Sequence, residues 1–228
     1  MNVEIDAGLS KNLKRFARSQ GADLVRFAGA ESFEKAPAGH RPTDLLKGAR
    51  NVIVIAIVLP TAAFESAPSR EYSISYIVAN KELDRIAFRI AKYLQYRGYR
   101  ALHVPASPPY NLENMMGDLS HRHAANLAGI GVFGKNSLIL SPKHGGRIRL
   151  VSIITDAPLV PDKMLRLDLC KNCAKCIRSC PARALKGDGI VDKASCDRRH
   201  VQISKQLQLA DWEECCGVCI RVCPIGRK

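Results

Sequence analysis

Hydrophobic residues recur at two different spacings in the first half of the chain. Leu9 and Leu13 lie at helical spacing and Gly21 follows them, which predicts an opening amphipathic helix. The unbroken apolar run 52–59, closed by Pro60, is typical of a central strand buried on both faces. The same reasoning predicts a strand over 23–28, a long helix over 70–97 and a further strand over 100–106.

The pattern changes after a polar, proline-containing loop at 107–117. A helix is expected from Asp118 to Ala128, with Asp118 as its N-cap. The strand-like runs 137–142 and 147–155 are separated by the turn KHGG, which predicts an antiparallel hairpin. This order of elements indicates an α+β layered domain.

Cysteine is confined to the end of the sequence. All nine cysteines fall between Cys170 and Cys223, so we expect an α/β core over 1–162 and a separate cysteine module over 163–228. The N-terminus lacks the apolar stretch of an export signal, and no apolar run approaches the roughly 20 residues of a membrane span. A cytoplasmic protein with no membrane partner is expected, and clustered cysteines in that compartment indicate metal rather than disulfides.

The cysteine spacing is that of a protein with two iron–sulfur clusters. The first run is Cys-x2-Cys-x2-Cys-x3-Cys-Pro, in which the fourth cysteine binds the other cluster of a pair. The second run, Cys-x2-Cys-x3-Cys-Pro, lacks one cysteine, and the isolated Cys196 can replace it. Two [4Fe-4S] clusters are therefore predicted, one held by Cys170, Cys173, Cys176 and Cys223, the other by Cys180, Cys196, Cys216 and Cys219.

Two alternatives to this assignment stay open. A structural zinc site would show two separated Cys-x2-Cys pairs around one ion, and Cys180 would then have no role. Cys215 is left over by the cluster assignment, either as a buried thiol that binds nothing or as a ligand in place of Cys216.

The segment GIGVFG matches a dinucleotide-binding fingerprint at Gly129, Gly131 and Gly134. That fingerprint follows a strand and opens a helix, whereas here a helical pattern precedes it and Pro142 with a tight turn follows it. The glycines indicate instead a backbone that approaches something closely, or a helix C-cap followed by a tight turn.

Residues 128–159, followed by the double cysteine run, resemble the corrinoid-dependent family of reductive dehalogenases and epoxyqueuosine reductases. The similarity extends upstream through GADLVRFAGAE, LLKGARNVIVIAI and YLQYRGYR, so it covers nearly the whole chain. It implies a nitroreductase-like layered core that holds cobalamin, followed by a ferredoxin-like module with two [4Fe-4S] clusters that reduce the cobalt.

The resemblance also implies which residues contact the corrinoid. Arg41 could equally be a solvated loop residue, and Arg147 and Arg149 could form the wet face of a strand. The predicted contacts are Arg41, Gly129, Gly131, Gly134, Lys135, Asn136, Ser141, Pro142, Arg147, Arg149 and Thr155.

The sequence departs from the family at the proton donor. Epoxyqueuosine reductases carry an acid where this chain has Met115, three residues before Asp118. A reductive step needs a positioned acid, so Asp118 or His121 is predicted to act as the catalytic proton donor. The competing interpretation of Asp118 is the helix N-cap.

These features together predict a cobalamin-dependent iron–sulfur reductase with an unidentified substrate, either a small molecule or a group carried on tRNA. Its electron donor would be a protein such as a ferredoxin or flavodoxin. An electron-transfer or corrinoid-handling protein without substrate turnover is the first alternative. A nucleic-acid-binding ferredoxin-like protein is the second, suggested by the net charge of +14 alone, since aromatic platforms for bases are not evident.

Overall fold

A computed structural model describes residues 5–107, 111, 113, 116–209 and 216–227. It divides into two compact units. The first comprises the described residues up to Ile57 together with Asn80–Ile130 and Arg149–Leu165, and the second comprises Val58–Ala79, Gly131–Ile148 and the described residues from Arg166 onward. The predicted boundary between residues 162 and 163 stays a prediction.

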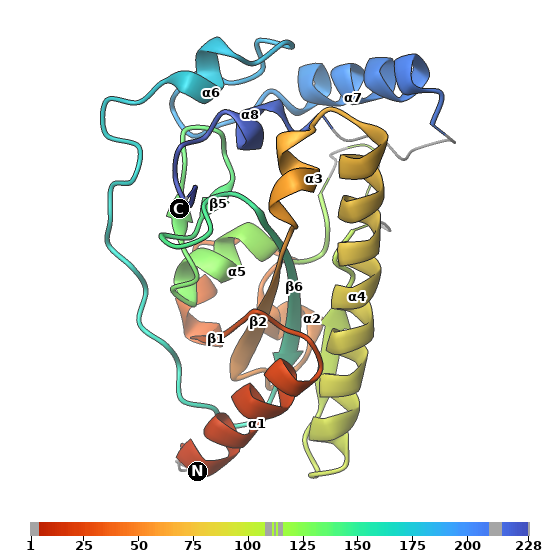
Figure 1. Ribbon diagram of the computed structural model, residues 1–228. Helices are drawn as coiled ribbons and strands as arrows, with labels where there is room; N and C mark the ends of the chain where they lie inside the picture. Colours follow the sequence, from red (N-terminus) through yellow and green to blue (C-terminus); the bar gives the residue numbers. More distant parts are fainter. Residues whose placement is uncertain (1–4, 108–110, 112, 114–115, 210–215, 228) are drawn as a thin grey trace. The chain divides into compact units, whose positions relative to one another are not determined.

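Helices and strands are mixed along the chain, as the hydrophobic pattern predicts (Figure 1). The elements are α1 Ala7–Ser19, β1 Leu24–Gly29, the 3-10 helix η1 Ala30–Phe33, α2 Pro42–Leu45, β2 Asn51–Val58, α3 Thr61–Glu65, α4 Arg70–Gln95, β3 Ala101–Val104, α5 His121–Leu127, β4 Val132–Phe133, β5 Ile139–Leu140, β6 Ile148–Thr155, α6 Lys175–Arg178, α7 Lys193–Leu207 and α8 Val218–Arg221.

The main sheet has the strand order β1-β2-β6-β3. β1 pairs antiparallel with β2, and β3 pairs antiparallel with β6. The backbone N–H of Arg50 donates to the carbonyl of Thr155 and that of Leu59 to the carbonyl of Arg147, so β2 and β6 also run antiparallel. The predicted central strand is confirmed, because the first six residues of β2 are buried.

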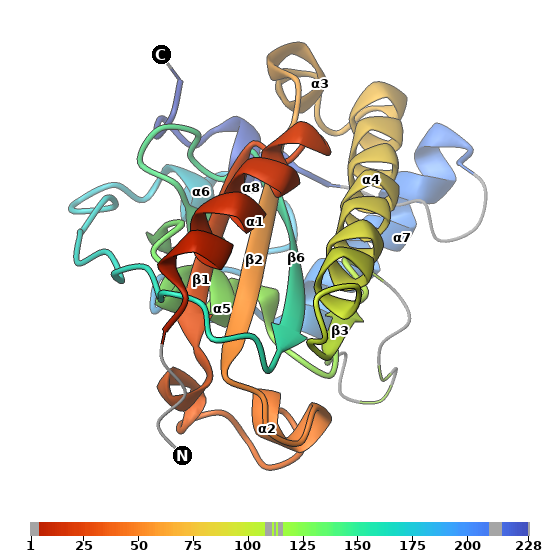
Figure 2. The same cartoon turned by 90° about the horizontal axis from the view of Figure 1, so that it is seen from below.

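Two helices cover one face of this sheet. Leu9 and Leu13 of α1 and Leu83 and Ile86 of α4 share a hydrophobic cluster with alternate residues of β1, β2 and β6. The side chain of Asp6 caps α1 by accepting the N–H of Leu9 at 2.7 Å. Figure 2 shows α1 lying across β1 and β2, with α4 beside it.

α5 lies on the opposite face of the sheet (Figure 2). His121 of α5 contacts Ser152 of β6, whereas the residues before and after Ser152 belong to the hydrophobic cluster that includes α1. Because side chains alternate along a strand, Ser152 faces away from α1. The helix begins later than the sequence indicates. Its N-cap is Ser120, whose hydroxyl accepts the N–H of His123, so the prediction that Asp118 caps this helix is wrong. Serine competes well with aspartate at this position because either side chain satisfies a free N–H of the first turn.

The predicted hairpin between residues 137–142 and 147–155 is also wrong. β5 pairs with β4, and the chain turns between them through a hydrogen bond from the N–H of Gly134 to the carbonyl of Leu138. β6 instead joins the main sheet between β2 and β3. Its β-branched residues are buried there on both faces, which a two-stranded hairpin could not achieve.

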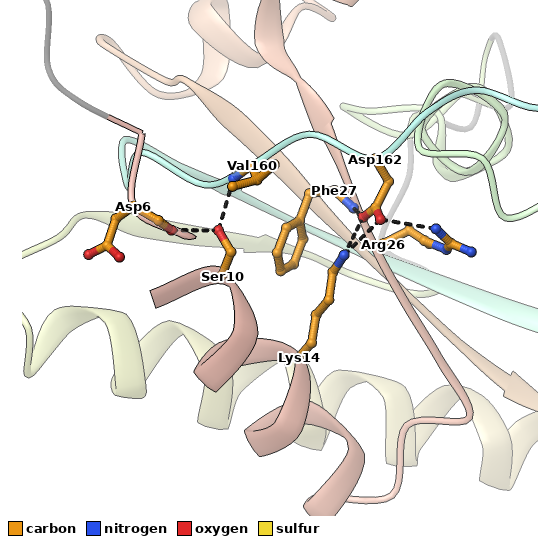
Figure 3. A network of polar contacts seen from close by, with 7 residues as sticks. All are labelled: Asp6, Ser10, Lys14, Arg26, Phe27, Val160 and Asp162. Carbon is orange, nitrogen blue, oxygen red and sulfur yellow. Dashed lines mark hydrogen bonds and ion pairs between the residues drawn. The ribbon is translucent and has the colours of Figure 1, made fainter. Parts of the chain in front are cut away.

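An irregular segment after β6 returns across α1 and β1 within the first unit (Figure 3). The carboxylate of Asp162 accepts hydrogen bonds from Lys14 Nζ at 2.7 Å, from Arg26 at 3.0 Å and from the backbone N–H of Phe27 at 2.9 Å. Two residues earlier in the chain, the N–H of Val160 donates to the hydroxyl of Ser10. These contacts fix the segment as far as Asp162. Among the described residues, no helix is long and apolar enough to cross a membrane.

Candidate functional site

Asp168 shapes the start of the cysteine segment. Its carboxylate accepts the backbone N–H groups of Cys170 at 3.1 Å and Lys171 at 2.9 Å. The bond from Lys171 is the main reason why the pKa of Asp168 lies below its ordinary value. The N–H of Cys173 then donates to the carbonyl of Cys170 at 2.7 Å, closing a tight turn. Sequence reasoning missed Asp168, although an aspartate two residues before a turn is a known local signal.

Four cysteines line one small cavity, which we call the first cradle. Burial is the main cause that raises the pKa of Cys176. The thiolates of Cys170 and Cys223 raise this pKa further, which shows that they lie close to Cys176. The structure thus brings together the four residues that the spacing assigned to one cluster. The lining consists of Cys170, Cys173, Cys176, Cys223, Asn136, Leu140, Leu169, Lys175, Pro224 and Ile225.

The other four described cysteines form a second set. Cys196 lies on α7 and Cys219 on α8. Burial is the main cause that raises the pKa of Cys219 to about 12 and that of Cys196 to about 11, and the neighbouring Cys216 adds to both. Cys180 acts on both in the same direction. This is the set that the exchange of fourth ligands predicts.

These surroundings fit iron–sulfur clusters. Crowded, half-buried thiols ionise together only when cations compensate their charge, and cluster iron supplies that charge. Among the described residues, no three His, Cys, Asp or Glu side chains are close enough to hold a single metal ion. The four cysteine sulfurs around a [4Fe-4S] cluster lie farther apart than the ligands of a single ion, because each thiolate binds a different iron. The eight described cysteines form no disulfide, and Cys215 lies outside the described residues.

Backbone N–H groups already point at two of the sulfurs. The N–H of Lys135 donates to Cys170 Sγ at 3.4 Å, and the N–H of Ala184 donates to Cys180 Sγ at 3.3 Å. Lys135 also fixes the cysteine loop through its Nζ, which donates to the carbonyl of Lys171 at 2.7 Å. The GIGVFGKN segment therefore reaches the cysteine module, and hydrogen bonds of this kind tune cluster potentials.

The three glycines of that segment are packed against the chain itself. Gly129 follows the last turn of α5 with a φ of +76°, and the N–H groups of Gly129 and Ile130 donate to Asn126 and Ala125. This confirms the helix C-cap interpretation. A Cβ at Gly129 would collide with the carbonyl of Lys163. Similarly, a Cβ at Gly131 would meet the carbonyl of Leu140, and one at Gly134 the side chains of Asn136 and Leu140. A strand follows the motif rather than a helix, unlike a dinucleotide site.

Arg147 fixes the segment that follows Cys223. Its guanidinium donates to Thr61 Oγ1 at 2.7 Å and to the carbonyl of Gly226 at 2.6 Å, and it lies over the ring of Phe64 at 5.0 Å. Gly226 also packs so tightly against the turn at Gly145 that a Cβ on either residue would collide with backbone. Arg147, predicted as a corrinoid contact, thus holds the backbone three residues after Cys223, a contact that sequence reasoning missed.

The remaining predicted corrinoid contacts lie in different surroundings. Arg41 lines a cavity of about 780 Å³ that contains none of the others. Thr155 is fully buried and donates to the carbonyl of Arg100, while Arg149 donates to Asn80. Ser141 is buried beside Gly145, whereas Pro142 is exposed.

The two predicted proton donors differ in their surroundings. Asp118 is exposed, and its backbone carbonyl contacts the ring of His40 at 3.0 Å. His121 is half-buried, with Nε2 at 2.8 Å from the carbonyl of Pro105 and Nδ1 at 2.9 Å from Ser152 Oγ. A carbonyl only accepts, so Nε2 carries a proton and the hydroxyl of Ser152 donates to Nδ1. Burial is the main cause that lowers the pKa of His121, and Arg149 adds to it.

This environment of His121 predicts a pH-dependent stability. Because the folded pKa lies below 6.5, the unfolded chain binds more protons as the pH falls, and the protein loses stability from pH 7 toward pH 5. We expect His121→Gln to flatten this dependence, measured as the thermal midpoint at matched iron content. His103→Gln is the control for replacing a histidine outside this site. An unchanged slope in His121→Gln would contradict the prediction.

The chain was compared with known proteins, and no family model matches it. Among curated proteins, it is 26% identical to the epoxyqueuosine reductase of Bacillus cereus, over 95% of this chain and 64% of that protein. It is 27% identical to the tetrachloroethene reductive dehalogenase of Sulfurospirillum multivorans, over 78% of this chain and 36% of that one. The chain thus spans about 64% of the length of the first of these relatives.

Solved structures show the same fold. An epoxyqueuosine reductase labelled with selenomethionine matches 96% of this chain and 66% of its own, with a TM-score of 0.67 at 22% identity. An epoxyqueuosine reductase with an epoxyqueuosine-modified tRNA stem loop gives a TM-score of 0.67 at 23% identity, over 96% and 65% of the two chains. A reductive dehalogenase covers the whole chain with 34% of its own, with a TM-score of 0.77 at 22% identity.

Proposed function

We propose that the chain is an iron–sulfur reductase of the corrinoid-dependent family of epoxyqueuosine reductases and reductive dehalogenases, to which it is similar over most of its length. Two [4Fe-4S] clusters, in a ferredoxin-like module over 163–228, would pass electrons to a cobalamin held by a nitroreductase-like core over 1–162. A ferredoxin or flavodoxin is the proposed electron donor.

The observation that carries this proposal is the sorting of the cysteines. Cys223 lies with three cysteines of the first run in one cradle, while Cys180 from the first run is close to Cys196 and Cys216. A zinc site would not need this exchange, whereas two adjacent clusters use it to share one short module. Two clusters in series provide a route for single electrons, which is what a cobalt reductase requires.

The relatives support two substrate classes. One solved neighbour is an epoxyqueuosine reductase with a modified tRNA stem loop, which supports a substrate carried on tRNA. The net charge of +14 is favourable for binding such a polyanion. The dehalogenase relatives support a small molecule instead.

Cobalamin, when bound, would supply the reducing centre for the substrate. We propose that Asp118 donates the accompanying proton, since its carboxyl group is exposed. His121 is the less suitable donor, because both ring nitrogens are engaged with Pro105 and Ser152 and its lowered pKa favours the neutral form. The predicted corrinoid contacts other than Asn136 would hold the cofactor.

A second candidate function is electron transfer without substrate turnover. It is supported by the two cysteine sets, which electron transfer alone requires, and by Met115 at the position where epoxyqueuosine reductases carry an acid. Cobalamin binding separates the two functions.

The test is anaerobic reconstitution followed by a cobalamin titration. We expect about eight iron atoms per chain, because two filled cubanes contain that number. Added cobalamin should change its visible spectrum on binding and be reduced when an electron donor is supplied. Zinc in place of iron would overturn the cluster assignment. Full iron without cobalamin binding would leave electron transfer as the function.

A further inference from the structure

Asn136 carries the least satisfied polar group near the first cradle. The side chain is only 5% exposed, and its Nδ2 is buried without a hydrogen-bond partner among the residues that the structure describes. The same residue lines the first cradle together with four cysteines. A buried amide group without a partner destabilises the folded protein, so its presence calls for an acceptor.

The orientation of this amide is fixed by its other atom. Oδ1 accepts the backbone N–H of Leu138 at 3.3 Å, and an N–H cannot donate to Nδ2. A flipped amide would lose this bond, so the –NH2 group is the end that lacks a partner. The adjacent backbone N–H of Lys135 already donates to Cys170 Sγ. Lys135 thus directs a donor at the first cradle, and the next residue, Asn136, lines that cradle with a buried donor that has no partner among the described residues.

From this geometry, and resting on the proposed function, we propose that Asn136 Nδ2 donates a hydrogen bond to a sulfur of the first cluster and raises its reduction potential. Sulfide and thiolate sulfurs of a cluster are acceptors, and they become more negative when the cluster gains an electron. A donor held against them stabilises the reduced state more than the oxidised state. Asn136 is thus a positioning and tuning residue of the cluster rather than a catalytic one.

The test is a redox titration of both clusters, followed by electron paramagnetic resonance, in the reconstituted full chain. Asn136→Leu removes the donor at similar volume. We expect the equilibrium constant for one-electron reduction of one cluster to fall roughly tenfold, which corresponds to about 59 mV. The other cluster should keep its potential.

Two further variants separate tuning from loop geometry. Asn136→Ser keeps an oxygen that can accept the N–H of Leu138 but cannot reach as far as the amide, so it should lower the same potential. Asn51→Leu is the matched control, because Asn51 is also a buried asparagine with an unpartnered atom, Oδ1, yet lines a cavity without cysteines. It should leave both potentials unchanged.

Each outcome decides the proposal. Full iron with unchanged potentials in both Asn136 variants overturns the role of Asn136 and leaves the clusters established. A fall in Asn136→Leu but not in Asn136→Ser assigns the effect to the turn and also overturns it. Loss of the cluster in both variants does the same, since a tuning donor is not needed for assembly. Absence of iron in the wild type would refute the proposed function itself.

Discussion

Replacing Cys180 by alanine should remove about half of the iron, reducing it from about eight to about four atoms per chain. Cys180 belongs to the first cysteine run, but its neighbours are Cys196, Cys216 and Cys219. A cubane that loses one of four thiolates to a side chain without a donor atom is expected to be lost. The cluster of the first cradle should remain, because Cys223 lines that cradle and is its proposed fourth ligand.

Double variants show which cluster each cysteine serves. Because Cys180 and Cys219 belong to one set, the combination Cys180→Ala/Cys219→Ala should retain about four iron atoms. Cys180→Ala/Cys176→Ala should retain almost none, since it removes a ligand from each set. Ser179→Ala is the control beside Cys180 and should keep all the iron.

If Cys180→Ala/Cys176→Ala retained about four iron atoms and Cys180→Ala/Cys219→Ala almost none, each cysteine run would hold its own cluster. Iron and acid-labile sulfide, measured after the same anaerobic reconstitution, provide the readout. The singles alone could not distinguish the two arrangements, because either one predicts the loss of a single cluster.

The fold was predicted best where one kind of periodicity dominates. The apolar run of β2 and the helical spacing in α4 identified both elements with nearly the right ends. The pairing of β5 was predicted wrongly, because two short strands on either side of a turn show the same local pattern whether or not they pair. The partner of β6 is decided by burial between β2 and β3, which depends on contacts distant in sequence.

The site was predicted best where covalent chemistry sets the spacing. The two cysteine sets could be written from the Cys-x2-Cys spacing together with the exchange of the cysteine that precedes each proline. The partners of the glycines were harder to predict, because a glycine in the sequence indicates a close approach but does not identify the group that approaches. At Gly131 the close group is the carbonyl of Leu140 in the paired strand. Similarly, the partners of Arg147 lie far away in sequence, at Thr61 and Gly226.

Replacing Gly129 by alanine should destabilise the protein by about 3 kcal/mol. Two costs contribute: the φ of +76° disfavours any L side chain, and the new Cβ would collide with the carbonyl of Lys163. Relief of the collision requires movement of the segment that Asp162 fixes to Lys14 and Phe27. Overpacking of this kind typically costs about 1–3 kcal/mol beyond the backbone strain.

Gly48→Ala is the matched control for this prediction. Its φ of +82° imposes the same backbone strain, but no atom lies within 4 Å of the added Cβ, so it should cost only about 1–2 kcal/mol. Urea unfolding of both variants gives the difference in the free energy of unfolding, and cobalamin titration of the folded proteins gives the second readout. If Gly129 is needed for a corrinoid rather than for Lys163, the two variants will be equally stable and Gly129→Ala alone will bind cobalamin more weakly.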